Sequence, residues 1–459
     1  MKNKLHYTFF LAFLVTLGLI ALHYLPEIKV GGKSLRKVDL LSDIRIDVSK
    51  SDTVSLDTFP ALPIVKPAFV DSCKAGIECI EDYSDSTSHG MSHFYESLLS
   101  VNEMKRPVRI AYFGDSFIEG DILTADLRNM LQKEFGGSGV GYVPVTSKFP
   151  GFRPTVKHSF SGWVSHNVTD TVGFTRNRQD ISNNYFHATQ GAYVSLEGTG
   201  KYASNLASCT SSSFYYLTSD SLYITAQLNG TDEQEFRLLG DSTLQCVTVT
   251  GDIKSVRWNI RNVSPDAIFY AATMDSKRGI ILDNFSTRGS SGQQLLGIPA
   301  SILRKYNQLR KYDLIVIQYG LNVAFEGGMD YTYYKDGMKS VISHLQKSFP
   351  DTSILIVSIG DRETKDESGN LRTMPEIKAL IRSQQMLAAE TGVAFWNMFK
   401  AMGGDGSMSE MVNSKPAMAN YDYTHINFRG GKHLASLLFD ALMYGKEQYE
   451  KRKAYEAEQ

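Results

Sequence analysis

Short apolar segments alternate with amphipathic helical patterns in two separate parts of this 459-residue chain. In the first part, an apolar segment at residues 108–113 is followed, after a turn, by apolar residues at helical spacing up to residue 135. The second part begins at residue 302 and continues the alternation to residue 442. Apolar strands separated by helices are typical of a parallel sheet that helices cover on both faces. We therefore expect an α/β fold.

The second part predicts three helix–strand pairs and a last helix. In chain order, the predicted elements are a helix at 302–309, a strand at 314–317, a helix through 341–345, a strand at 354–357, a helix at 376–391, a strand at 393–395 and a final helix from residue 432.

Residues 151–281 have a different pattern, without a convincing helix. Residues 221–228 and 235–239 flank the pair Asn229-Gly230, which is a strong signal for a tight hairpin turn. Residues 255–260 alternate between apolar and polar side chains, as a strand with one buried face does. We predict a β-sandwich at residues 151–281, inserted into the α/β domain.

The N-terminus predicts a membrane anchor. Residues 7–25 are nearly uncharged and follow Lys2 and Lys4, and a helix of this length spans about 28 Å, enough to cross a bilayer core. We expect residues 1–25 to be an uncleaved, single-pass signal anchor in the inner (cytoplasmic) membrane, with the bulk of the chain in the periplasm. A cleaved signal peptide is the alternative, but no small-residue cleavage site follows. Residues 26–92, which hold several prolines, are expected to form a stalk.

The charge balance of the chain argues against nucleic acid as a partner. The chain has 48 Lys and Arg against 49 Asp and Glu, so no basic field is available to hold nucleic acid.

Cys73 and Cys79 are spaced for a small disulfide loop, and Cys209 and Cys246 are a second candidate pair. No CxxC motif or histidine lies at zinc-ligand spacing, so no metal site is expected.

The first candidate catalytic residue is Ser116, in the sequence Gly-Asp-Ser-Phe directly after the strand at 108–113. A serine there lies at the carboxyl edge of a parallel sheet, where open α/β folds place ligands. Taken alone, an Asp-Ser pair before a helix is more often a helix cap. The second candidate pair is Asp422 and His425, because an aspartate three residues before a histidine can orient the imidazole as a base.

Two further positions could stabilise an oxyanion. Asn322 follows the strand at 314–317, where its amide can donate a hydrogen bond. Gly292 ends the sequence Gly-Ser-Ser-Gly, and glycine lets a backbone N–H approach a substrate oxygen. Gly289 is the alternative to Gly292. Each motif alone also fits an ordinary turn.

Together, and in this order, the four motifs resemble the SGNH (GDSL-type) hydrolase family over residues 108–148 and 283–442. The resemblance implies a flavodoxin-like three-layer α/β/α domain in two parts, residues 93–150 and 282–459. It also implies a nucleophile, a base and an orienting carboxylate, an oxyanion hole, and no cofactor. These roles fall on Ser116 (nucleophile), His425 (base), Asp422 (orienting carboxylate), and the N–H groups of Ser116 and Gly292 with the Asn322 side chain (oxyanion hole).

Some residues depart from the family pattern or extend it. Phe117 replaces the family's leucine, and Val323 stands where an acidic residue is frequent. The longer sequences at 114–121 and 135–142, followed by a β-rich insert, are similar to exported SGNH proteins that act on O-acetyl groups of cell-wall glycans, in which the insert resembles a carbohydrate-binding module. Aromatic residues of the insert would then either stack on sugars or fill its core: Tyr185, Phe186, Phe214, Tyr215, Tyr216 and Trp258.

The resemblance implies a serine esterase that removes acyl groups, chiefly acetyl, from a surface or cell-wall polysaccharide or from peptidoglycan. The alternative with the same residues is an O-acetyltransferase that works with a membrane-bound O-acyltransferase partner. A third alternative is a catalytically inactive glycan-binding protein, which conflicts with four intact motifs.

Overall fold

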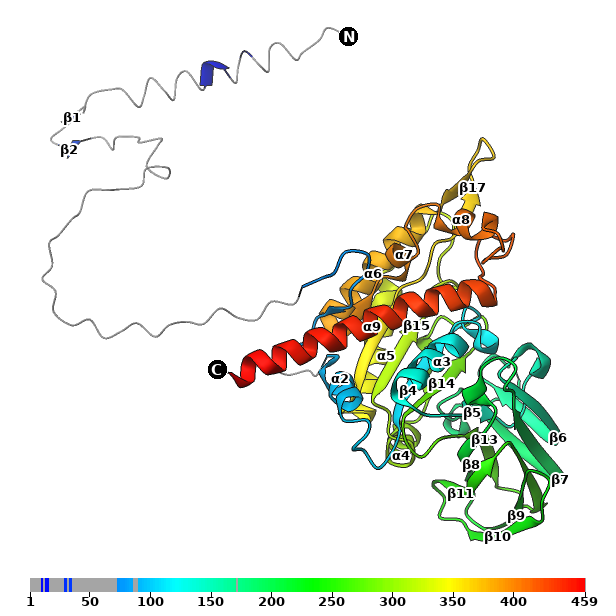
Figure 1. The fold of residues 1–459 in the computed structure, drawn as a ribbon. Helices are drawn as coiled ribbons and strands as arrows, with labels where there is room; N and C mark the ends of the chain where they lie inside the picture. The colour runs from blue at the N-terminus through cyan, green and yellow to red at the C-terminus, as the bar shows by residue number, and fades with distance from the viewer. Residues whose placement is uncertain are drawn as a thin grey trace, which may run out of the picture. The chain divides into compact units, whose positions relative to one another are not determined.

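The computed structural model describes residues 10, 13–15, 29–30, 33–34, 72–85, 90–170 and 172–458. The expected anchor at 1–25 and much of the expected stalk at 26–92 lie outside these ranges. Within them, no helix has the length and apolar character that crossing a membrane requires. Phe69–Gln459 form one compact unit (Figure 1). A separate two-stranded pairing joins β1 (Lys29–Val30) and β2 (Lys33–Ser34).

A six-stranded sheet forms the centre of the α/β part. Its strands, in spatial order, are β14 (Ile280–Ser286), β4 (Val108–Gly114), β15 (Leu314–Gln318), β16 (Ser353–Val357), β19 (Ala394–Trp396) and β3 (Glu81–Asp82). All neighbouring strands are parallel except β19 and β3. Numbered along the chain, the five parallel strands follow the flavodoxin-like order 2-1-3-4-5. The predicted α/β fold with a parallel sheet is confirmed.

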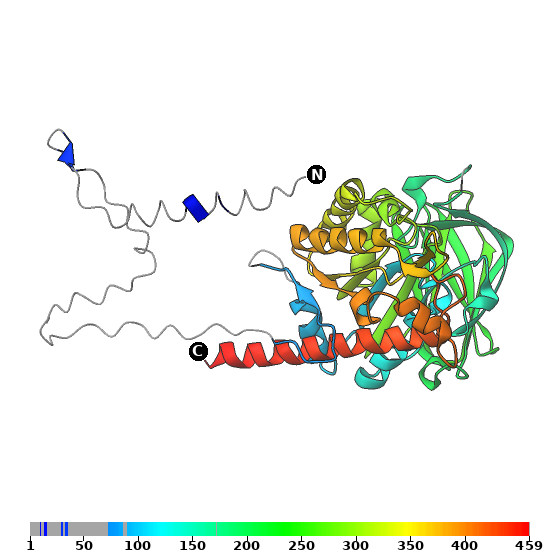
Figure 2. The ribbon, with the colours of Figure 1, turned by 90° about the horizontal axis from the view of Figure 1, so that it is seen from above.

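Helices cover both faces of this sheet, as Figure 2 shows. On one side α2, α3 and α7 pack against α9, and on the other α4 and α6 pack against α5. The helices of the described residues beyond Ser92 are α2 (Ser92–Leu99), α3 (Thr124–Phe135), α4 (Ala300–Leu309), α5 (Thr332–Ser348), α6 (Pro375–Thr391), α7 (Met398–Ala401), α8 (Ser407–Asn413) and α9 (Phe428–Ala457). A small hairpin of β17 (Glu363–Lys365) and β18 (Leu371–Thr373) precedes α6.

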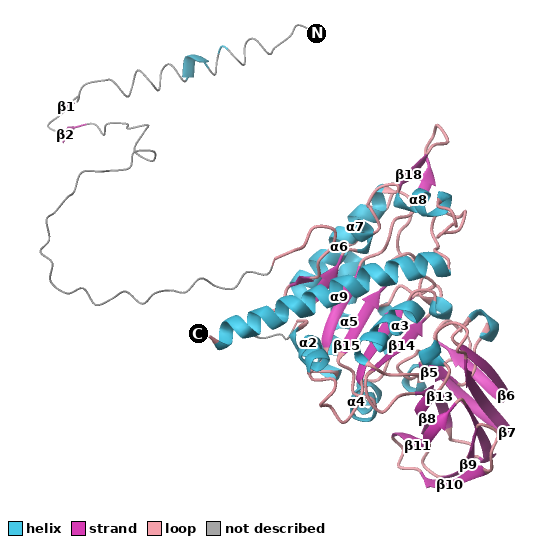
Figure 3. Cartoon of the chain, in the orientation of Figure 1, coloured by secondary structure: helices cyan, strands magenta, loops and turns pink. Residues whose placement is uncertain are grey.

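The second sheet is antiparallel and gathers nine strands (Figure 3). They are β5 (Gly141–Pro144), β6 (Val156–Asn167), β7 (Asn184–Gly198), β8 (Cys209–Leu217), β9 (Ser221–Leu228), β10 (Glu233–Leu239), β11 (Leu244–Ile253), β12 (Ser255–Asn262) and β13 (Ile268–Met274). The predicted hairpin is present, since β9 pairs with β10 across Asn229-Gly230. These strands belong to the same compact unit as the α/β part, so a domain boundary at 151 and 281 stays a prediction.

The antiparallel sheet folds over on itself to enclose a core. Two strands separate β8 from β12 in the sheet order, which would place them about 14 Å apart in a flat sheet. The rings of Phe214 on β8 and Trp258 on β12 nevertheless stack with centroids 5.4 Å apart. The aromatic residues proposed to stack on sugars are all at most 3% exposed and fill the protein core: Tyr185, Phe186, Phe214, Tyr215, Tyr216 and Trp258. The sugar-stacking interpretation of these six residues is therefore wrong.

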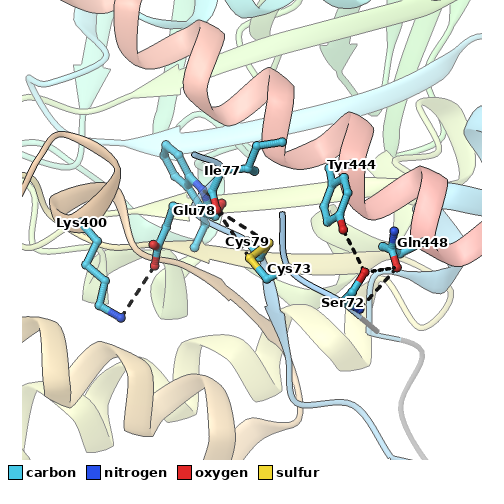
Figure 4. The surroundings of a disulfide bond; sticks show 9 residues. Ser72, Cys73, Ile77, Glu78, Cys79, Lys400, Tyr444 and Gln448 are labelled. Carbon is cyan, nitrogen blue, oxygen red and sulfur yellow. Dashed lines mark hydrogen bonds and ion pairs between the residues drawn. A yellow bond between two sulfur atoms is a disulfide. The ribbon is translucent and has the colours of Figure 1, made fainter. Parts of the chain in front are cut away.

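A disulfide joins Cys73 to Cys79 in a segment that packs on the folded unit (Figure 4). Before this loop, the Ser72 hydroxyl lies 3.0 Å from the Tyr444 hydroxyl of α9. Within it, the Glu78 carbonyl accepts a hydrogen bond of 3.0 Å from the Trp396 indole. Directly after the loop, the chain forms β3 at the edge of the central sheet. The second candidate pair does not form a disulfide, since Cys209 and Cys246 are both free thiols.

The two sheets are joined by a buried arginine. Arg310, at the end of α4, contacts Asp275, which follows β13, at 2.5 Å and Asp283, on β14, at 2.6 Å. All three side chains are at most 4% exposed. Burial alone would raise the pKa of Asp283, but the Arg310 guanidinium holds it below its ordinary value. Arg310 thus forms an ion pair with one carboxylate from each sheet at their boundary.

Arg310→Met should lower the free energy of unfolding by about 3–5 kcal/mol, because it leaves two buried carboxylates without their cation. The neighbouring Lys311→Met is the matched control. It removes an exposed ion pair of 3.6 Å with Asp351 and should cost less than about 1 kcal/mol. Urea unfolding of both variants measures the difference, and equal losses would contradict a special role for Arg310.

Candidate active site

The predicted site residues lie at the carboxyl edge of the parallel sheet. Ser116 follows the end of β4, and Asn322 follows the end of β15. β4 and β15 are neighbours, and the strand order reverses between them. Open α/β sheets bind ligands outside such a switch point, because loops from adjacent strands diverge there and leave a crevice.

Ser116, His425 and Asp422 form a continuous chain of hydrogen bonds. Ser116 Oγ lies 3.3 Å from His425 Nε2, and His425 Nδ1 lies 2.8 Å from Asp422 Oδ2. A carboxylate can only accept, so Nδ1 carries the proton and Nε2 is left as an acceptor that faces the hydroxyl. This arrangement can take a proton from a serine that attacks a carbonyl carbon. The structure therefore brings the three predicted residues together.

Asp422 also shapes the loop that presents His425. Its Oδ1 accepts from the backbone N–H groups of Thr424 at 3.0 Å and His425 at 2.9 Å. Partial burial would raise the pKa of Asp422, but the hydrogen bonds from His425 and Thr424 outweigh it and hold the pKa below its ordinary value. Asp422 is therefore ionised at neutral pH, as an orienting carboxylate must be.

The base is held at the start of α9. The Asn427 side chain caps this helix by accepting from the N–H groups of Arg429 and Gly430. In the first turn, Gly431 packs so closely on the loop after Ser116 that a Cβ would lie 1.8 Å from the Ile122 carbonyl oxygen. Only glycine fits there without moving the helix. Its missing side chain thus sets how closely the segment carrying His425 approaches the segment carrying Ser116.

Asn322 joins the serine and glycine motifs. Its Nδ2 donates to Asp115 Oδ2 at 3.1 Å and to the Ser290 carbonyl at 3.0 Å. These two bonds use both hydrogens of the amide. An oxyanion would have to share or replace one of them, so the oxyanion role of Asn322 stays a prediction.

Gly292 has the backbone geometry that the prediction requires. Its φ is +88°, and a Cβ would lie 2.7 Å from the Tyr319 ring, so a side chain is excluded on both grounds. Its N–H donates to Ser290 Oγ at 2.9 Å. A Cβ on Gly289, the alternative, would meet nothing within 4 Å. Gly292 is therefore the more constrained of the two, and its role as an oxyanion donor also stays a prediction.

Asp115 is a site residue that the sequence alone indicates only as a possible cap. It is 1% exposed and accepts from the Phe117 N–H at 2.9 Å as well as from Asn322. Burial raises the pKa of Asp115 to about 6, although the Phe117 N–H, the nearby His425 and the Asn322 amide each lower it. The signal in the sequence was its place between a buried strand and the candidate nucleophile.

No group of three or more His, Cys, Asp or Glu residues suited to a metal ion is found in the part of the chain that the structure describes. The polar groups around Ser116 are instead linked to one another by hydrogen bonds.

Comparison with solved structures identifies a protein of the same fold. A structure described as a peptidoglycan O-acetylesterase is 22% identical in sequence, and the match covers 80% of this chain and 99% of that one with a TM-score of 0.65. This match confirms the fold that the resemblance to the SGNH family implied. A family 2 carbohydrate esterase from Cellvibrio japonicus is 9% identical over 66% of this chain and 98% of that chain, with a TM-score of only 0.25. No protein-family model and no curated protein sequence matches the chain.

Asp422→Asn separates the two functions of this carboxylate. The asparagine Oδ1 can still accept from the two backbone N–H groups, but its amide cannot accept from His425 Nδ1. We expect normal thermal unfolding and a fall in kcat of at least about 100-fold, measured on a chromogenic acetyl ester. Unchanged kcat in a folded variant would mean that Asp422 only shapes the loop.

Asp115→Asn should change how stability depends on pH. The folded-state pKa of about 6 lies above the ordinary value of 3.8, so the wild-type carboxyl favours the folded state below about pH 4 and loses this contribution as the pH rises through 6. The variant does not titrate. Its free energy of unfolding relative to wild type should therefore rise by up to about 3 kcal/mol between about pH 4 and about pH 7. Urea unfolding across that range measures the difference, and a constant difference would contradict the raised pKa.

Proposed function

We propose that this chain, which has the fold of a peptidoglycan O-acetylesterase, is a serine esterase that removes O-acetyl groups from a polysaccharide or peptidoglycan. The hydrogen-bonded chain from Ser116 through His425 to Asp422 carries the proposal. It stands at the switch point of the sheet, with the base aimed at the hydroxyl. Acetyl is proposed as the acyl group because the solved structure of the same fold is described as an O-acetylesterase.

The reaction follows from the proton positions. Ser116 Oγ attacks the ester carbonyl carbon while His425 Nε2 takes the hydroxyl proton, and Asp422 stabilises the imidazolium through Nδ1–H. The imidazolium then gives this proton to the sugar oxygen as the C–O bond to the acyl group breaks. Water attacks the acyl-enzyme with His425 again as the base, which releases acetate and restores Ser116.

Negative charge on the carbonyl oxygen needs hydrogen-bond donors. We assign these to the N–H groups of Ser116 and Gly292 and to the Asn322 amide. Gly292 and Asn322 now donate within the protein, to Ser290 and Asp115. The oxyanion must compete with these acceptors, and it would do so best at full negative charge, in the transition state.

Exposure of the triad favours hydrolysis over transfer. The His425 and Asp422 side chains are 39% and 49% exposed, so water reaches the base from solvent. A transferase must instead keep water from its acyl-enzyme. The alternative is an O-acetyltransferase with a membrane-bound O-acyltransferase partner, and the experiment below distinguishes it from the esterase.

We also propose that the folded unit acts outside the cytoplasm, anchored by residues 1–25. The disulfide between Cys73 and Cys79 supports this location, because disulfides persist in oxidising compartments.

Ser116→Ala should lower acetate release by about 10⁴-fold or more, because the acyl-enzyme cannot form. Acetate is measured with an acetyl-ester chromogen and with O-acetylated peptidoglycan, each with and without an added unacetylated glycan. Wild type that releases acetate in every case is an esterase, whereas acetyl groups that appear on the added glycan indicate the transferase. Near-normal release by a folded Ser116→Ala variant would contradict the proposal, and circular dichroism provides the folding control.

A further inference from the structure

Residues 115–123, which join β4 to α3 and include Ser116, are called the serine loop. A cavity of about 630 Å³ lies between this loop and the antiparallel sheet. Its walls come from residues 119–121 of the serine loop, residues 143–153, strand β6, and residues 284–288 at the end of β14. Ligand pockets have volumes of about 300–1,000 Å³, so the cavity is large for an acetyl group and suited to a larger ligand.

The cavity begins beside the candidate nucleophile. Glu119 in its wall donates its N–H to the Ser116 carbonyl at 3.3 Å, and Thr287 donates to the Gly114 carbonyl at 2.9 Å. Glu119 also forms an ion pair with Arg288, which lines the same cavity. A ligand bound in the cavity therefore lies next to the segment that carries Ser116.

The lining combines aromatic rings with neutral polar groups. Phe149 is 57% exposed, and Phe160 and Trp163 of β6 are half-buried. The Trp163 indole is fixed by a hydrogen bond of 2.7 Å to the Tyr193 carbonyl. Hydroxyl and amide side chains lie among these rings, as at Ser165. Rings that stack on C–H faces, beside groups that bond hydroxyls, are the chemistry that binds sugars.

The charges in the lining are largely compensated. Glu119 pairs with Arg288, Asp121 pairs with Arg153 at 2.8 Å, and Lys148 is a further, exposed cation of the wall. Burial lowers the pKa of His158 to about 4, so this side chain is neutral at pH 7. A nearly neutral lining fits a sugar chain and not a polyanion such as nucleic acid.

The loop that carries Phe149 is anchored at its end by buried hydrogen bonds. Arg153, which ends this loop, and the Thr155 hydroxyl both donate to the buried Asp121 carboxylate, at 2.8 and 2.6 Å. Arg128 donates to the same carboxylate at 3.0 Å. Anchoring one end of the loop lowers the cost of ordering it on binding.

We infer that this cavity binds the sugar rings next to the acetylated one, by stacking on Phe149, Phe160 and Trp163. The inference rests on the proposed function, because it takes the ester at Ser116 to belong to a polysaccharide strand. The cavity then selects an ester carried by a glycan strand over the same ester on a small alcohol.

Binding is measured by calorimetry on the full chain carrying Ser116→Ala, which leaves the ester intact. The probes are O-acetylated peptidoglycan fragments, from the disaccharide to longer strands, and acetylated xylo-oligosaccharides in parallel. Longer fragments of at least one probe should bind more tightly than its shortest fragment. Phe149→Ala should weaken binding of the longer fragments by about tenfold, the value of one aromatic stacking contact.

Ser165→Trp should weaken binding of the longer fragments by at least about tenfold, because it fills the cavity. Ser159→Trp is its matched control, an exposed serine of the same strand outside the cavity, and should bind as the parent does. Thermal unfolding checks that each variant is folded. Unchanged affinity in a folded Ser165→Trp variant overturns the inference, as does a parent that binds neither probe.

Acetate release from a small ester by wild type, compared with Ser116→Ala, reports the proposed function without the cavity. Ester hydrolysis together with unchanged glycan affinity in Ser165→Trp would therefore overturn the cavity inference alone. Loss of glycan binding in Ser165→Trp, with no acetate release by wild type from either the small ester or O-acetylated peptidoglycan, would support the cavity and overturn the esterase.

Discussion

The buried Arg310 guanidinium fixes how the two sheets of this protein meet. Asp275 belongs to the antiparallel side and Asp283 to the parallel side, and the arginine between them forms a buried ion pair with each carboxylate. Removing the cation would leave both carboxylates buried without an opposite charge. Tyr142 and Tyr306 add a second tie, because both hydroxyls reach the buried Asp180 carboxylate. Groups that must be paired permit few relative positions of the sheets. The cavity beside Ser116 exists because β6 is held at this position relative to the serine loop.

Much of the α/β part could be predicted because its sequence pattern has a direct physical cause. Strands β15 and β16 are buried along their whole length, and each contains a run of four consecutive apolar residues. Strand β3 was missed, because its two residues form a strand only by pairing with β19, far along the chain. The antiparallel sheet was recognised from its hairpin, but its folding over depends on contacts such as Phe214 with Trp258 that no local pattern records.

The candidate site could be predicted in its residues but not in its connections. Ser116, Asp422 and His425 lie in short motifs whose spacing indicates their chemistry, and the structure brings them into contact. The link from Asp115 to Asn322 joins residues more than 200 positions apart. A buried carboxylate next to the nucleophile opposes folding at neutral pH, since burial raises its pKa to about 6. Such a residue is tolerated where it orients a neighbouring group, which here is the Asn322 amide.

The contact between Gly431 and Ile122 has a consequence for how proteins of this design can diverge. A single added methyl group would meet the Ile122 carbonyl at 1.8 Å and push the first turn of α9 away from the serine loop. The hydrogen bond between Ser116 and His425 is already 3.3 Å long, so even a small retreat would break it. Gly431 does not contact the proton that His425 would accept or the ester. Its replacement would nevertheless break the hydrogen bond between Ser116 and His425. A survey that ranks positions by their chemistry alone would pass over it.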